Sequence, residues 1–277
     1  MVINMNSRKT SFLSARIHKY ATISRVSLSN AINYRASMLS GFLAFTLYIY
    51  IFMGLWRVIY QEGGVYGYTY RQIVWYLTMT ELVGYFAGAA AVYRTMSDDV
   101  KTGAIAYLLG RPVHYIAYQL INALGQAAFN IFAYGLLAIV LGFAFVGPLP
   151  GFSAINIPAI FVSVALGFLL QYFFMALIGL TAFYIEDNFA IYLIFNKLTF
   201  MLGTFLPVEF LPPRLLPIVK ALPFSYVSWA PAKLFVDFSP RLFMELVPLQ
   251  AMWTAVLLAA TLLCYRAAAK RLQINGG

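Results

Sequence analysis

Two ionisable side chains lie inside long apolar stretches, where a charge is costly. Glu81 falls near the middle of an apolar run at about 72–93, and Lys197, next to Asn196, falls in a run at about 189–206. Placing such a charge at the centre of a membrane costs about 2.5–3.5 kcal/mol on insertion scales, so each is expected to face protein or a wet cavity. Two interpretations stay open: a substrate path or conformational latch, or a structural role as a polar pair between helices or as a protonated Glu81.

A second group of polar side chains lies in the stretch 97–112, a polar island in an apolar chain. Ser97 is a favoured residue for a helix N-cap, and Asp98 and Asp99 would follow in the first turn, where carboxylates suit the positive end of the helix dipole. Gly110 stands where such a helix would end. The pattern predicts a short helix with marked ends, outside the lipid, that carries Lys101 and Arg111 as its basic residues.

Apolar residues recur at helical spacing within this stretch, at Val100, Ala104, Tyr107 and Leu108. An exposed apolar stripe on a short helix between two membrane spans predicts a partner protein that covers it. The alternative is a helix lying on the lipid headgroups, and the pattern alone does not decide between the two. Gly103 would allow the close approach of another backbone.

Several kinds of catalytic or metal-binding site have no counterpart in the sequence. There is no G-x-x-x-x-G-K-[ST] phosphate loop, so the chain is not expected to hydrolyse ATP itself. His18 and His114 are the two histidines, and neither has the spacing of a metal ligand. A G-x-S-x-G elbow and an H-E-x-x-H pair are also missing. The sequence therefore favours a chain that is not an enzyme and holds no metal or cofactor of its own.

The composition identifies a membrane protein. The chain has 277 residues, of which 62% are hydrophobic and only 10% charged, whereas soluble domains carry about 25% charged residues. The net charge of +10 could indicate nucleic-acid binding. Anionic lipid and the positive-inside rule explain the basic residues better, because apolar spans follow the basic N-terminus at once.

The long apolar runs define an all-α polytopic fold in one permease-sized domain, 1–277. An amphipathic helix over Phe12 to Arg35 is predicted to lie in the headgroup plane and to lead into the first span. Six membrane-spanning helices are then predicted from runs of about 20 apolar residues. They cover about 36–56, 72–93, 115–146, 157–185, 189–206 and 247–265.

The basic residues predict the orientation of these spans. An even number of spans places both termini on one side, together with the loop at 94–112 and the tail at 266–277. That side carries 12 of the 19 lysines and arginines, so the positive-inside rule makes it cytoplasmic. The expected location is the cytoplasmic membrane of a prokaryote, with both termini inside.

The stretch 207–245 before the last span is rich in proline. Eight of the 12 prolines lie between Pro207 and Pro248, yet leucines and other apolar residues separate them. Proline breaks helices, and broken helices at membrane depth survive only when they are buried in protein or line a cavity. We expect a re-entrant hairpin of two short helices in the outer leaflet, with Pro207, Pro212 and Pro223 as gate residues. An ordinary amphipathic external loop is the alternative.

These features together resemble those of the type-2 ABC exporter permeases. The exit of the fifth span resembles the family pattern of glycine, spaced prolines and tyrosine, and the polar helix resembles its "D…G…L…P" loop. The first match rests on Gly203, Pro207, Leu211, Pro212, Leu222, Pro223, Tyr226 and Pro231, and the second on Asp99, Gly103, Leu108, Leu109 and Pro112. The chain is also similar to six-span ABC permeases that are often encoded beside a second, related permease. Unlike some members, it has no large external domain.

The resemblance implies a division of labour between subunits. Two permease chains, identical or related, would form the pore, and two separate ATP-binding subunits would hold the ATP and magnesium. The polar helix would be the coupling helix seated in the ATP-binding subunit, with coupling residues from Ser97 to Arg111. The proline-rich stretch would form the external gate. By analogy with the family, transport is outward, of a drug, peptide, lipid or glycan.

Other classes of membrane protein fit the sequence less well. An ABC importer permease should carry an E-A-A-x-x-x-G loop, and the stretch from Ala104 reads A-I-A-Y-L-L-G without the glutamate. A secondary transporter should show inverted repeats and more charges within its spans. Membrane enzymes need a convergent polar cluster, for which Glu81 and Lys197 are too few. An assembly or anchoring protein remains an alternative.

Overall fold

A computed structural model of the chain describes residues 35–63, 67–86, 89–110, 114–185 and 187–275. These parts of the chain are helical with short connections, and contain no β-strand. The predicted amphipathic lead-in helix at 12–35 lies outside the described residues except for Arg35, with which α2 begins.

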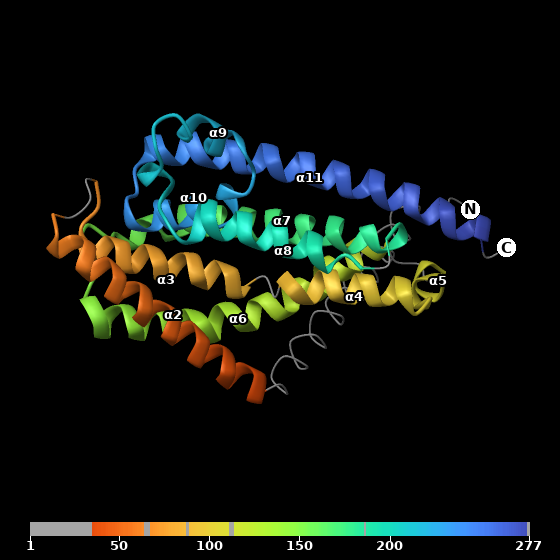
Figure 1. Ribbon diagram of the computed structural model, residues 1–277, viewed down its shortest axis with the longest axis horizontal. Coiled ribbons are helices and arrows are strands. Elements are labelled where there is room, and N and C mark those ends of the chain that lie inside the picture. The colour runs from red at the N-terminus through yellow and green to blue at the C-terminus, as the bar shows by residue number, and fades with distance from the viewer. Residues whose placement is uncertain (1–34, 64–66, 87–88, 111–113, 186, 276–277) are drawn as a thin grey trace, which may run out of the picture.

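Four described helices are long and apolar enough to cross a membrane. They are α2 (Arg35–Gln61), α6 (Tyr115–Val146), α7 (Ile157–Leu180) and α11 (Pro240–Asn275). Figure 1 shows α6, α7 and α11 running lengthwise through the molecule. The four correspond to the predicted first, third, fourth and sixth spans, although α11 extends beyond the predicted span at both ends.

The predicted second and fifth spans are built from shorter pieces. The second consists of α3 (Tyr70–Phe86), which has 17 residues, and α4 (Ala89–Lys101) continues from it in the same direction (Figure 1). The fifth consists of α8 (Phe189–Thr199) and a π-helical turn, η3 (Phe200–Thr204). The predicted end of this span at residue 93 is therefore wrong, because the helix that carries its last residues runs on to Lys101.

Helix α7 is the centre of the bundle. In the most apolar part of α7, 61% of the residues are buried inside the protein, whereas the corresponding share in α2 is 11%. Helix α7 therefore packs against other helices on most sides, and α2 leaves most of its side chains at least partly exposed. A polar contact joins α7 to two neighbours: the Gln250 side chain of α11 donates from Nε2 to the Tyr226 carbonyl at 2.9 Å, and Ser163 Oγ donates to Gln250 Oε1 at 2.7 Å. Each polar atom of this buried contact therefore has a hydrogen-bond partner, as is usual for polar groups in a protein interior.

The proline-rich stretch folds as three short elements. They are a 3-10 turn, η4 (Val208–Phe210), then α9 (Leu216–Ala221) and α10 (Ser225–Val236). Helix α10 is buried and packs against both α3 and α7, so it belongs to the bundle and is not an exposed loop. A side chain at Gly167 of α7 would approach within 2.5 Å of the Val227 carbonyl oxygen, so the glycine allows α7 and α10 to touch.

The remaining short elements are α5 (Ala104–Leu109), η1 (Ala154–Asn156) and η2 (Thr181–Phe183). In Figure 1, α5 and the C-terminal end of α11 lie at one end of the molecule, and α9 lies at the other. The predicted coupling stretch and the basic tail thus share an end that is opposite the proline-rich stretch.

Candidate functional site

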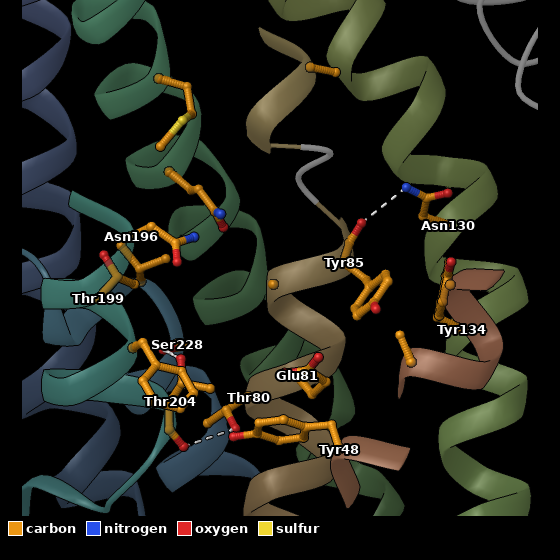
Figure 2. A pocket seen from close by; sticks show the side chains of 18 of the residues that line it. Tyr48, Thr80, Glu81, Tyr85, Asn130, Tyr134, Asn196, Thr199, Thr204 and Ser228 are labelled. Atoms are coloured by element: carbon orange, nitrogen blue, oxygen red, sulfur yellow. Dashed lines mark hydrogen bonds between the residues drawn. The ribbon is translucent and has the colours of Figure 1, made fainter. Parts of the chain in front are cut away.

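A cavity of about 1150 Å³ lies in the middle of the bundle, walled mainly by α2, α3, α6 and α8. Helices α4, α7 and α10 and the turn η3 contribute the rest of its wall. In Figure 2 the α3 side chains, among them Glu81, lie in the centre of the view. Asn196 and Thr199 lie on one side of them, and Asn130 and Tyr134 lie on the other. Its walls carry many polar and aromatic side chains: Ser40, Tyr48, Thr80, Glu81, Tyr85, Gln126, Phe129, Asn130, Tyr134, Gln171, Tyr192, Phe195, Asn196, Thr199, Phe200, Thr204 and Ser228.

Glu81 lines this cavity, and Lys197 does not. The Glu81 side chain is half-buried on α3, whereas Lys197 is exposed on α8, where its neighbour Asn196 faces the cavity instead. No ion pair joins the two side chains in the described structure. The hypothesis of a Glu81–Lys197 pair that holds the helices together is therefore wrong, and Lys197 as a path residue stays a prediction without support from the cavity.

Three buried polar atoms on the cavity wall have no hydrogen-bond partner within the described protein. They are the Tyr48 hydroxyl, Gln171 Oε1 and the Thr199 hydroxyl. Gln171 and Thr199 are 8% and 9% exposed, so little water from outside the cavity can reach them. Buried polar groups in proteins are almost always paired, so these three are available to a guest in the cavity.

The π-helical turn η3 shapes one wall of the cavity. A wider turn of this kind shifts backbone carbonyls out of the regular helical pattern, and such turns are frequent at functional sites. Tyr76 of α3 donates from its hydroxyl to the Gly203 carbonyl at 2.7 Å. A Cβ atom at Gly203 would come within 2.8 Å of Ser228 Oγ on α10, so the glycine lets η3 and α10 approach closely. The sequence motif with Gly203 indicated this region, but not its π-helical geometry.

The predicted gate prolines lie outside the cavity wall. Pro207 is buried and precedes η4, Pro212 is exposed between η4 and α9, and Pro223 is buried just before α10. They belong to the end of the molecule that carries α9 in Figure 1. Their role as gate residues stays a prediction.

The polar stretch 97–112 differs from its prediction. Ser97 is not an N-cap, because it lies inside α4, where its hydroxyl donates to the Tyr93 carbonyl at 2.7 Å. It also accepts a hydrogen bond from Asn188 Nδ2 at 2.7 Å, which ties α4 to the turn before α8. The helix that contains Asp98 therefore begins at Ala89 instead of at Ser97, since the apolar stretch before it continues into α4.

Gly103 divides the predicted helix into two. Its φ of +74° is left-handed, and this conformation separates α4 from α5. A Cβ atom at Gly103 would have nothing within 4 Å, so the glycine serves the turn and not a close contact within the chain. Gly110 ends α5 as predicted, although in a right-handed conformation with φ of −71°.

The apolar stripe is divided by the same turn. Val100 on α4 and Leu108 on α5 pack against the core, whereas Ala104 is exposed and Tyr107 is 69% exposed. Ile105, which the predicted stripe did not include, is fully buried. The exposed apolar surface of α5 is therefore narrower than the predicted stripe, and Tyr107 is its large side chain.

Some of the charged residues predicted to contact the ATP-binding subunit are exposed, and one points into the protein. Asp98 and Lys101 are exposed, and Arg111 lies outside the described residues. Asp99 instead points into the protein, where its Oδ2 accepts hydrogen bonds from the Tyr115 hydroxyl at 2.7 Å and from Gln119 Nε2 at 3.0 Å. Burial raises the pKa of Asp99, against the opposing effect of these hydrogen bonds. Asp99 thus attaches the end of α4 to the start of α6.

A second polar cluster lies near the end opposite α5. Lys233 of α10 pairs with Asp237 at 2.7 Å and with Glu209 at 3.7 Å, and its ammonium lies 4.4 Å from the centre of the Tyr68 ring. Trp229 Nε1 donates to Glu209 Oε2 at 3.2 Å. Because the cation is matched within the cluster, we assign these residues to the attachment of η4 to α10.

The chain matches the family described as ABC-2 family transporter protein over residues 44–276. It belongs to this family. The ABC-2 permease is a multi-pass membrane subunit of an ABC transporter, it is not the catalytic subunit, and proteins of this family normally work with an ATP-binding subunit. The resemblance inferred from the sequence is thereby confirmed. A search of the curated proteins finds no significant match.

Proposed function

We propose that this ABC-2 permease exports an organic molecule through the central cavity, with the energy supplied by ATP hydrolysis in a separate subunit. The observation that carries the proposal is the family match over residues 44–276. The cavity supports it, since a chamber of about 1150 Å³ among apolar helices can hold a small molecule. Drug, peptide, lipid and glycan remain the classes implied by the family.

In this proposal the end of the molecule with α5 receives the ATP-binding subunit. Tyr107 offers an exposed aromatic anchor there, as is common at the centres of protein interfaces. The hydrogen bonds of Asp99 and Ser97 join α4 to α6 and to the turn before α8. A displacement of α5 would pass through these contacts to α6 and α8, two helices that wall the cavity.

The proposed assembly and orientation follow the positive-inside rule and the family resemblance. Two permeases and two ATP-binding subunits form the transporter, and the ATP-binding subunits hold ATP and magnesium. The α5 end and both termini face the cytoplasm of a prokaryote, with six crossings of the inner membrane. The stretch 207–245 enters the outer leaflet from outside and acts as the gate. Lipid surrounds the exposed apolar faces of α2 and α6.

The test is purification of the tagged permease from its own membranes in a mild detergent, followed by mass spectrometry and an ATP hydrolysis assay. We expect a chain with a phosphate loop to co-purify in an equal amount, and the complex to hydrolyse ATP. Replacement of the phosphate-loop lysine in that partner should abolish hydrolysis while the complex persists. A permease that purifies intact without an ATP-binding chain, and without hydrolysis, would contradict the proposal.

A further inference from the structure

The described lining of the cavity carries a single charged side chain, and it is acidic. Glu81 is the one acidic residue among the described residues that line the cavity, and that lining includes no lysine, arginine or histidine. Glu81 also forms no ion pair with any described side chain. A carboxylate held among apolar helices is unfavourable until a cation or hydrogen-bond donors approach it.

Aromatic rings surround the space in front of Glu81. In the view of Figure 2, Tyr85 lies above Glu81 and Tyr48 below it, and Tyr134 faces them from α6. The Tyr85 and Tyr134 rings are 4.5 Å apart between centroids. The faces of aromatic rings attract cations, and desolvated sites strengthen this attraction.

The three polar atoms without a partner also favour a guest that donates hydrogen bonds, whatever its charge. Gln171 Oε1 can only accept a hydrogen bond, and the Tyr48 and Thr199 hydroxyls can accept as well as donate. Gln171 and Thr199 are more than nine-tenths buried and belong to the cavity wall. A guest with N–H or polarised C–H donors would satisfy them, whereas a phosphate or carboxylate guest would find no cationic side chain.

We infer that the cavity binds an amphipathic organic cation, an amine or quaternary onium compound with aromatic or aliphatic groups, whose charge is placed against Glu81. The inference rests on the proposed function in one respect: it takes the bound cation to be the molecule that is transported. It selects among the classes implied by the family, because a glycan or lipid carried on a phosphate would bring a negative charge next to Glu81. Tyr48 and Tyr85 flank the bound charge, and Tyr134 packs against the Tyr85 ring.

The test compares two probes of nearly the same shape and opposite charge, tetraphenylphosphonium and tetraphenylborate. Saturable binding of each labelled probe is measured on the purified permease in detergent, as the signal displaced by excess unlabelled probe. We expect saturable binding of the phosphonium and none of the borate. Glu81→Gln should weaken phosphonium binding by about tenfold or more, because it removes the charge and keeps the shape.

Glu62→Gln is the matched control, since Glu62 is an exposed glutamate outside the cavity, and it should bind the phosphonium as the wild type does. Absence of saturable phosphonium binding, equal binding of the borate, or full affinity in a folded Glu81→Gln protein would overturn the inference. If Glu81→Gln fails to fold, the comparison of the two probes on the wild type decides alone. Binding needs no ATP-binding subunit, so its failure is distinct from failure of co-purification, which concerns the proposed function.

Discussion

At the scale of single residues, Gly103 is required by its backbone conformation. Its φ of +74° costs a residue with a Cβ about 1–2 kcal/mol, and the open space around it excludes a steric cause. We expect Gly103→Ala to loosen the junction of α4 and α5 and to speed amide hydrogen exchange in α5. Gly103→Asn should be milder, because asparagine tolerates the left-handed conformation.

Gly110 provides the control for this experiment. It ends the same helix, but its φ of −71° is available to any residue, and its nearest contacts are of ordinary length. Gly110→Ala should leave exchange in α5 unchanged. Equal acceleration by the alanine variants at both glycines would show that conformation is not the reason for Gly103.

Asp99 makes the permease sensitive to pH near the predicted cytoplasmic end. Burial raises the pKa of this carboxyl above its ordinary value of 3.8 in the folded protein. The folded state therefore holds the proton more tightly than the unfolded state, so stability from this group is present at low pH and is lost as the pH rises through the folded pKa.

We predict that the melting temperature of the wild type falls relative to that of Asp99→Asn as the pH rises above the ordinary carboxyl pKa of 3.8. The measurement is thermal unfolding of both proteins in detergent at a series of pH values. Asparagine keeps an acceptor for the Tyr115 hydroxyl, so the variant should fold. A difference in melting temperature that does not vary with pH would contradict this account of Asp99.

At the scale of helices and turns, the sequence allowed the long elements to be predicted and left the breaks uncertain. The third predicted span, 115–146, coincides with α6, because an uninterrupted apolar run permits one structure in a membrane. The start of α4 could not be found from Ser97, since a serine inside a helix can also bond back to the carbonyl four residues earlier, as this one does. Local pattern alone does not separate these two uses of serine.

The cavity was predictable only in part, from Glu81. An acidic residue in an apolar run indicates a polar environment whatever the fold. Its wall also depends on the π-helical turn at Phe200–Thr204 and on Gln171 of α7, and only the packing of distant segments brings these to the same cavity. The sequence could not show which of two adjacent polar residues faces the cavity: Asn196 lines it and Lys197 does not.

Helix α5 carries the prediction for subunit contact. Tyr107 is 69% exposed, so Tyr107→Asp should fold, yet it should reduce co-purification of the ATP-binding subunit by about tenfold, because a carboxylate would be buried at the interface. Ile155→Asp is the control: this residue is 83% exposed in η1, between the far ends of α6 and α7. Equal recovery of the partner with both variants would remove α5 from the contact surface.

At the scale of the whole molecule, the orientation can be measured with single cysteines after Cys264→Ser. Glu62 and Lys101 are exposed near opposite ends, at the ends of α2 and α4. In sealed cells an impermeant thiol reagent should label Glu62→Cys and should label Lys101→Cys only after the membrane is permeabilised. The reverse pattern would contradict the assignment of the α5 end to the cytoplasm.

The central claim is that the cavity is a transport path controlled by ATP hydrolysis in the partner. Asn196 and Ile194 lie on the same helix, α8: Asn196 lines the cavity, whereas Ile194 is 63% exposed on the outside of the bundle. Each is replaced by cysteine in the Cys264→Ser permease, and the complex with the ATP-binding subunit is purified. A small thiol reagent is then applied with and without trapping by ATP and vanadate.

The account predicts that trapping changes the reaction rate of Asn196→Cys severalfold, while that of Ile194→Cys stays the same. An unchanged rate at Asn196→Cys, in a complex that hydrolyses ATP, would contradict the claim that this cavity opens and closes during transport.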